Sequence, residues 1–127
     1  MSGWTDQELA QIGDTDEIDI AGRRLDGTLE PSRTIWIVRH GDCLFVRSVN
    51  GSEGGWFQGA RVRNEGRIFA GDVERDVRFE DADHAIDDAI DEEYRRKYGA
   101  SSSAVDHIND PKARATTLRV LPALDQT

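Results

Sequence analysis

The sequence predicts a single α+β domain built on antiparallel strands, and three observations lead to this class. Two pairs of β-rich segments are each joined by a short turn, which is the pattern of a β-hairpin. Residues 81–98 have the apolar spacing of an amphipathic helix. The length of 127 residues matches one domain of ordinary size, so we treat residues 1–127 as one unit.

The first half of the chain predicts one helix and three strands. A capping box of Thr5 and Glu8 begins a helix over residues 6–13. Residues 18–21 alternate between apolar and polar side chains, as a half-buried strand does. The segments 34–38 and 44–46 are rich in β-branched and aromatic residues, and we expect them to form the two strands of a hairpin.

The second half predicts two helices, a second hairpin and a closing strand. These elements are expected at 55–63 (helix), 66–71 and 73–79 (hairpin strands), 81–98 (helix) and 116–121 (strand), with a turn of helix after Pro111. The helix over 81–98 carries an apolar stripe that includes Ile86, Ile90 and Tyr94, so this face is predicted to pack on the core.

Charge and composition exclude several classes of partner. The formal net charge of -9 repels a phosphate backbone and an anionic membrane from most of the surface. No apolar run reaches the roughly 20 residues of a membrane span, and the N-terminus lacks a signal segment. We therefore expect a cytoplasmic protein with no nucleic-acid or membrane partner. Since the apolar fraction is only 37%, the core is small, which favours a homodimer.

The usual metal and catalytic motifs are missing from the sequence. His40, His84 and His107 lie far apart in the sequence, so no pair has metal-ligand spacing. Cys43 is expected to be a buried side chain that packs like an apolar residue. Asp83, Asp87 and Asp91 have i, i+4, i+8 spacing, but calcium loops space their ligands differently, so we predict a solvated face and no metal site. Metal-dependent hydrolysis, which has only this face behind it, ranks well below the other functional hypotheses. Because no nucleophile elbow, P-loop or dinucleotide fingerprint occurs, no side chain is nominated as catalytic.

The segment from Arg47 to Trp56 combines a cation, polar side chains, three glycines and an aromatic ring. It follows a predicted strand and precedes a predicted helix. Glycine-rich backbone and helix starts favour anions such as phosphate, so this loop is a candidate anion site. The alternative is a purely structural connection in which Trp56 and Phe57 cover the core.

Five segments of the sequence resemble a known family. They are Thr5-Asp-Gln-Glu-Leu-Ala, Ile35-Trp-Ile-Val-Arg39, Val46-Arg-Ser-Val-Asn-Gly51, Trp56-Phe-Gln-Gly-Ala60 and Tyr94-Arg-Arg-Lys-Tyr-Gly99. Together they resemble the bacterial domain-of-unknown-function family 2255. More remotely, residues 33–80 are similar to the deazaflavin-dependent nitroreductase group of the flavin-binding split β-barrels.

The resemblance implies an antiparallel split β-barrel with flanking helices, often a homodimer, that holds flavin mononucleotide or a deazaflavin near the loop after the third strand. By position, it implies cofactor-binding roles for Arg33, Thr34, Arg47, Ser48, Asn50, Gly51 and Trp56. The nitroreductase group has a Gly-Arg-x-Ser-Gly segment, whereas this chain has Gly22-Arg-Arg-Leu-Asp-Gly27.

Two functional hypotheses follow. In the first, the protein is a flavin- or deazaflavin-dependent oxidoreductase of unknown substrate, in which the protein binds and orients a ring that performs hydride transfer. In the second, the barrel has lost its cofactor and acts as a non-enzymatic small-ligand or protein-interaction module that uses the same cleft.

Overall fold

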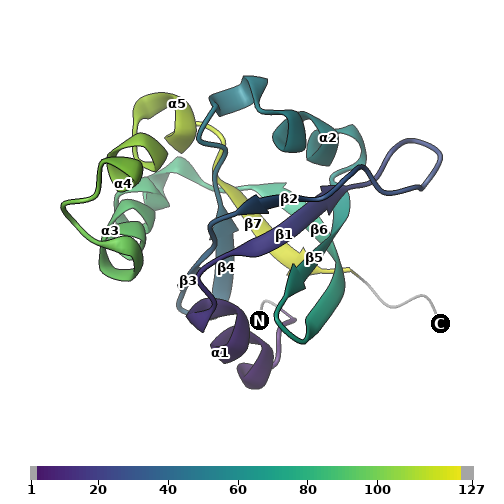
Figure 1. Ribbon diagram of the computed structural model, residues 1–127, viewed down its shortest axis with the longest axis horizontal. Helices are drawn as coiled ribbons and strands as arrows, with labels where there is room; N and C mark the ends of the chain where they lie inside the picture. The colour runs from purple at the N-terminus through teal and green to yellow at the C-terminus, as the bar shows by residue number, and fades with distance from the viewer. Residues whose placement is uncertain (1–2, 124–127) are drawn as a thin grey trace.

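The computed structural model describes residues 3–123, which form a single antiparallel sheet curled into a split barrel (Figure 1). The seven strands of this region lie in the order β2-β1-β5-β6-β7-β4-β3. Their bounds are β1 Ile18–Gly22, β2 Arg33–Ile35, β3 Val38–His40, β4 Cys43–Val46, β5 Glu65–Ala70, β6 Val73–Asp81 and β7 Leu118–Pro122. The predicted fold class, an α+β split barrel with flanking helices, is confirmed.

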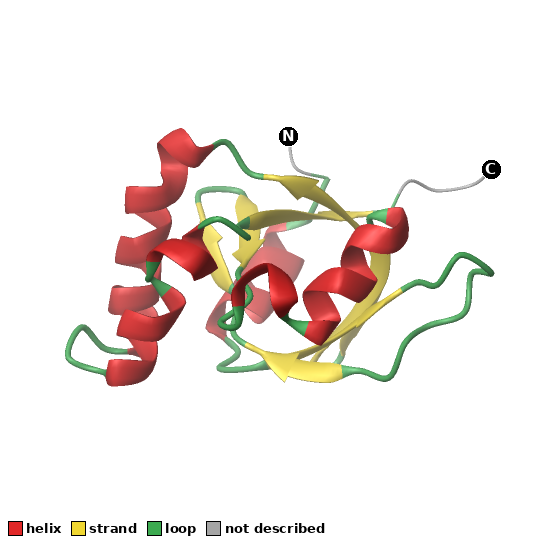
Figure 2. Ribbon diagram, turned by 90° about the horizontal axis from the view of Figure 1, so that it is seen from above, coloured by secondary structure: helices red, strands yellow, loops and turns green. Residues whose placement is uncertain are grey.

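The helices cover the ends and one side of the barrel. Their bounds are α1 Asp6–Asp14, η1 Gly51–Glu53, α2 Gly55–Arg63, η2 His84–Ile86, α3 Asp87–Tyr98, α4 Ser103–Ile108 and α5 Pro111–Arg114. α1 and α2 lie at opposite ends, while α3, α4 and α5 stand together beside the barrel (Figures 1 and 2). Within residues 3–123, no helix has the length and apolar character needed to cross a bilayer.

The expectation of one strand over residues 34–38 is wrong. β2 pairs with β1, with Ile35 opposite Ile18, whereas β3 pairs with β4, with Val38 opposite Phe45. The chain therefore crosses from one edge of the sheet to the other at Trp36 and Ile37. Side chains of α3 replace the ladder bonds missing at Ile37. The Ile37 backbone N–H donates to the Tyr98 hydroxyl at 3.3 Å, and Lys97 Nζ donates to the Ile37 carbonyl at 2.6 Å.

Two hydrophobic clusters form the interior. The first, which we call the barrel core, fills the sheet and includes Leu9, Ile12, Ile18, Ile20, Ile37, Leu44, Ile68, Phe79, Leu118 and Val120. The second, the helical core, lies where α3 and α4 pack on β3 and β4, and consists of Val38, Phe45, Ile90, Tyr94, Val105 and Ile108. Cys43, expected to be buried, is half-buried against the helical core.

One glycine permits the close packing of α2 on the sheet. A Cβ at Gly22 of β1 would lie 2.6 Å from the backbone carbon of Gly59 in α2, a distance that no side chain tolerates. The helix can therefore rest directly on β1, which places the start of α2 beside the strand edge.

The aspartate face of α3 corrects another expectation. Asp87 and Asp91, predicted to face water, are only 8% and 7% exposed. Asp83 remains exposed and caps η2 through the backbone N–H of Ala85. The helix turns its inner aspartates toward β4, because the Arg47 guanidinium is buried there and binds them. The helix α4 was not predicted at all.

Candidate functional site

A cavity of about 250 Å³ lies between β2, the end of β4, the start of α2, and α4. Its walls are formed by Glu17, Thr34, Ile35, Trp36, Arg47, Val49, Trp56, Ala104 and Ile108. We call it the tryptophan cavity. Three of the seven residues proposed from the sequence, Thr34, Arg47 and Trp56, therefore meet at one cavity.

The two tryptophans are held in place by other aromatic rings. Trp36, at the crossing between β2 and β3, stacks on Tyr98 of α3 with ring centroids 3.9 Å apart and planes 5° apart. Trp56, in the first turn of α2, meets Phe57 edge to face at 6.0 Å. Since each ring is fixed by a neighbour, the cavity has rigid aromatic walls.

Polar groups lie on β2 and the segment before β1. Thr34 donates its hydroxyl proton to Asp19 Oδ1 at 2.7 Å, which leaves the Thr34 oxygen able to accept a bond from a ligand. Glu17 adds a carboxylate to the cavity wall. Arg33, next to Thr34, is exposed and does not line the cavity, and it has no ion pair within residues 3–123.

Arg47 is engaged inside the protein. Its guanidinium donates to Asp91 Oδ1 at 2.5 Å, Asn109 Oδ1 at 2.9 Å, Thr117 Oγ1 at 2.9 Å and the Asp87 carbonyl at 3.1 Å. The side chain is fully buried. The expected contact of the Arg47 guanidinium with a cofactor phosphate stays a prediction, and this geometry argues against it because these bonds use most of the guanidinium donors. Arg47 contributes to the cavity as part of the wall.

The loop after β4 is a packed turn. Ser48 is buried and its backbone N–H donates to Thr116 Oγ1 at 2.8 Å, while Gly51, at φ +70°, donates its N–H to the Ser48 carbonyl at 2.9 Å. Asn50 is exposed. The N–H of Gly54 bonds to the Gly51 carbonyl, so these loop donors are satisfied within the protein. Ser48, Asn50 and Gly51 are not among the residues that line the tryptophan cavity.

Sequence reasoning missed part of the wall. Trp36 was assigned to a strand interior, because its segment reads as one continuous strand. Ala104 and Ile108 belong to the unpredicted α4. The only signal for that helix was the i, i+3 spacing of Val105 and Ile108 after Ser102, and both apolar residues are buried.

The histidines make ordinary polar contacts. His40 Nδ1 lies 2.8 Å from Glu93 Oε2, and His84 Nδ1 lies 3.0 Å from Asp87 Oδ2. Across residues 3–123, no group of three or more His, Cys, Asp or Glu side chains is arranged to hold a metal ion.

The fold is similar to that of several solved cofactor proteins. The heme storage protein HutZ from Vibrio cholerae has 10% identity and a TM-score of 0.69, with 94% of this chain and 91% of that chain covered. An F420 reductase has 14% identity and a TM-score of 0.58, with 95% and 97% covered. The FAD and heme binding protein from Mycobacterium smegmatis has 15% identity and a TM-score of 0.55, with 95% and 67% covered. At these identities the likeness shows the fold alone.

No curated protein matches the sequence. The model of a family described as uncharacterized protein conserved in bacteria (DUF2255) matches residues 8–120, which is most of the chain. The resemblance seen in the five sequence segments is thereby confirmed, and the chain belongs to the DUF2255 family.

Proposed function

We propose that the tryptophan cavity binds the ring of a flavin or deazaflavin and that the protein is an oxidoreductase dependent on this cofactor. The observation that carries the proposal is the pair of fixed rings, Trp36 and Trp56, on the walls of one cavity. Aromatic walls favour a flat conjugated ligand, which can stack on them. Solved structures of similar fold are named for F420, FAD and heme, which are ligands of this kind.

The cavity fits the ring better than a whole nucleotide. Its volume of about 250 Å³ is below the roughly 300 Å³ at which pockets for drug-sized ligands begin. The phosphate end would therefore extend outward. Arg33 is exposed beside Thr34 and free of ion pairs within the described residues, so we assign the phosphate contact to Arg33 rather than to Arg47.

Each wall would have a distinct role. A bound flavin or deazaflavin supplies hydride transfer, and the protein supplies binding, orientation and exclusion of water. Trp36 and Trp56 hold the ring, and the apolar side chains of Ile35, Val49 and Ile108 keep water from it. The Thr34 hydroxyl oxygen and the Glu17 carboxylate are acceptors for polar hydrogens at the ring edge.

We further propose that the protein is a homodimer. Its small core supports this proposal. Leu25 is 80% exposed on the loop that projects from the barrel between β1 and β2 (Figure 1), and a second copy would cover this side chain. Light scattering at micromolar concentration is expected to give twice the chain mass, and a monomer mass would contradict the proposal.

Titrations of the purified protein with flavin mononucleotide, oxidised F420 and riboflavin test the cofactor. We expect saturable binding of at least one, detected by absorption and by quenching of tryptophan fluorescence. Trp56→Ala should weaken binding by about 0.5 to 1.5 kcal/mol through loss of ring contact. The matched control is Val62→Ala, which alters an exposed position on the same helix and should leave the affinity unchanged.

One observation favours a second candidate function. The loop N–H groups of Gly51 and Gly54 and the Arg47 guanidinium are all bonded within the protein, so no ready phosphate cradle exists there. In this alternative the cavity holds a phosphate-free aromatic ligand in a non-enzymatic binding module. Binding of no flavin or deazaflavin, together with binding of a simple aromatic compound such as indole that Trp56→Ala weakens, would favour the alternative.

A further inference from the structure

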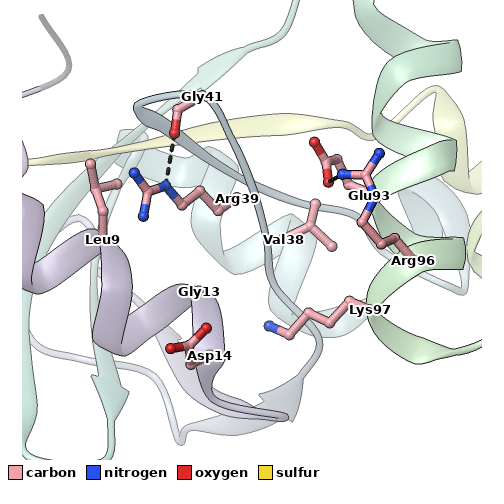
Figure 3. Close-up of a pocket in the computed structure, with 9 residues that line it drawn as sticks. All are labelled: Leu9, Gly13, Asp14, Val38, Arg39, Gly41, Glu93, Arg96 and Lys97. Atoms are coloured by element: carbon pink, nitrogen blue, oxygen red, sulfur yellow. Dashed lines mark hydrogen bonds and ion pairs between the residues drawn. The ribbon is translucent and has the colours of Figure 1, made fainter.

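A second cavity, of about 370 Å³, lies between α1, β3 and α3 (Figure 3). We call it the α1–α3 cavity. Its charged walls are Asp14, Arg39, Glu93, Arg96 and Lys97, and its apolar walls include Leu9 and Val38. Figure 3 shows Arg39 extending from β3 and Lys97 from α3 on the two sides of this space, with Asp14 on α1. None of these residues lines the tryptophan cavity.

Two of the cations in this cavity lack a carboxylate partner, although the chain has a large excess of Asp and Glu. Most Arg and Lys side chains within residues 3–123 form ion pairs with Asp or Glu, but Arg39 and Lys97 do not. The Arg39 Nε–H donates to the Gly41 carbonyl at 2.8 Å, and its two terminal amino groups have no hydrogen bond in the described part of the chain. Those groups remain able to bind a ligand.

Lys97 is held in a setting that disfavours its charge. Burial lowers the pKa of Lys97 to about 8, against the opposing effect of the carboxylates of Asp16 and Asp14. Its Nζ also lies 5.1 Å from the centroid of the Tyr98 ring and donates to the Ile37 carbonyl. An anion beside Nζ would stabilise the ammonium form and raise this pKa.

The charge balance indicates which anion the cavity selects. The Glu93 carboxylate is paired with Arg96 Nη1 at 2.5 Å, so it does not oppose a ligand strongly. Asp16 acts on Lys97 from outside the cavity lining, and Asp14 is the other carboxylate in the lining besides Glu93. Three cations and two carboxylates therefore line the cavity, which leaves one positive charge in excess among the lining side chains. A singly charged ligand matches this excess, whereas a dianion would be repelled by Asp14.

We propose that the α1–α3 cavity binds a small organic anion with one carboxylate group and an apolar portion. The carboxylate lies between Arg39 and Lys97, where the planar guanidinium can form a paired contact with it. The apolar portion lies over the floor of the same space, which Leu9 and Val38 form from within the protein, each only 1% exposed. This site is independent of the cofactor proposal, since it uses other residues and another cavity.

Competitive acylation of the two lysines tests the proposal. Lys97 and Lys112 are the only lysines of the sequence, and Lys112 is exposed outside the cavity, so it serves as an internal standard. Trace acylation at pH 7.5 is followed by mass spectrometry with butyrate or inorganic phosphate present, and with sodium chloride at equal ionic strength as the reference. Butyrate should slow Lys97 labelling by about threefold, as a rise of about half a pKa unit predicts, and leave Lys112 unchanged.

Variants identify the cations involved. Arg39→Gln should abolish the protection by butyrate and Arg39→Lys should retain part of it, while Arg95→Gln, an equal charge change on α3 outside the cavity, should retain all of it. Circular dichroism confirms that each variant is folded. Equal slowing of both lysines, no protection, stronger protection by phosphate than by butyrate, or unchanged protection in Arg39→Gln and Arg39→Lys would overturn the proposal.

Discussion

The barrel core and the helical core are stabilised in different ways. The barrel core contains only apolar side chains, such as Ile20, Ile68 and Val120, which alternate along the strands. The helical core packs Ile90 and Tyr94 on the outer face of the sheet, and it borders the buried guanidinium of Arg47, whose carbon Cζ lies 5.5 Å from the centroid of the Tyr94 ring. The strands are joined by backbone hydrogen bonds and by apolar packing, whereas α3 is also anchored by a buried ion pair.

Arg47 connects elements that are far apart in the sequence. From the end of β4 it bonds to Asp91 of α3, to Asn109 at the end of α4 and to Thr117 just before β7. An apolar residue at this position could fill the same space, but it could not form the directional hydrogen bonds that hold these three partners together. A buried ion pair adds little net stability compared with apolar packing, yet removal of one partner is very costly. The helical side should therefore be the more sensitive to loss of a single charge.

The largest effect is expected from Arg47→Met. This change removes the nearer of the two cations that pair with the buried Asp91 carboxylate, since only Arg114 Nε, 3.5 Å from Asp91 Oδ2, remains. It should lower the free energy of unfolding by about 3 kcal/mol. Urea unfolding measures the loss. The control is Arg61→Met, whose ion pair with Asp81 is exposed and should contribute less than about 1 kcal/mol. Similar small losses in both variants would show that the network does not anchor the helices.

Truncation in the two cores compares their apolar packing directly. Ile90 and Ile68 are both fully buried, one in each cluster. Ile90→Ala and Ile68→Ala should each destabilise the protein by about 2 to 5 kcal/mol in the same urea experiment. A loss below about 1 kcal/mol for Ile90→Ala alone would mean that the ion pair, and not the packing, holds α3.

Asp87→Ala should have an intermediate effect of about 1 kcal/mol. The Asp87 carboxylate lies 3.9 Å from Arg47 Nη2, farther than that of Asp91, and it favours the first turn of α3 through the helix dipole. Its backbone carbonyl, which bonds Arg47, survives the substitution. If this variant loses as much stability as Asp91→Ala, measured alongside it by urea unfolding, the two aspartates contribute equally to the network.

The smallest effect concerns pH and Lys97. The pKa of Lys97 falls from 10.5 to about 8 on folding, because the ammonium loses water. Below pH 8, Lys97 is protonated in both the folded and the unfolded state, and the folded state bears the full cost of desolvating the ammonium. Between pH 8 and about 10.5 the unfolded chain binds more protons, so the Lys97 contribution to the free energy of unfolding rises with pH. In urea titrations over this window, the free energy of unfolding of the wild type should rise relative to that of Lys97→Met, which has no titrating group at this position. A difference between the two proteins that stays constant with pH would contradict the prediction.

Local patterns predicted most of the fold, and long-range contacts account for what they missed. The capping box at Thr5, the helix at Gly55–Arg63 and the turn after Ala70 depend on neighbours in sequence, and each was predicted. The crossing at Trp36 could not be predicted, because the break depends on curling of the sheet. The burial of Asp87 and Asp91 also depends on a partner, Arg47, some forty residues away.

The candidate site shows the same limit. The family resemblance predicted that Thr34 and Trp56 lie near a ligand, and both residues line the tryptophan cavity. Arg47 was expected to bind phosphate, since an arginine at a strand end beside glycines suits an anion. A single sequence does not show that Arg47 lies beside its acceptors on α3 and at the end of α4. Only the structure reveals that the guanidinium is hydrogen-bonded to them.

The position of β7 has a consequence for folding. This strand, residues 118–122, pairs with β4 on one side and β6 on the other. It joins two groups of strands, β3 with β4 and β2 with β1, β5 and β6, which have no other strand pairing between them in the described residues. Its partners lie far away in sequence, so their pairing must overcome a large loop-closure entropy, which slows folding. During synthesis the barrel can close only after β7 has left the ribosome, and until then the edges of β4 and β6 are exposed to other chains.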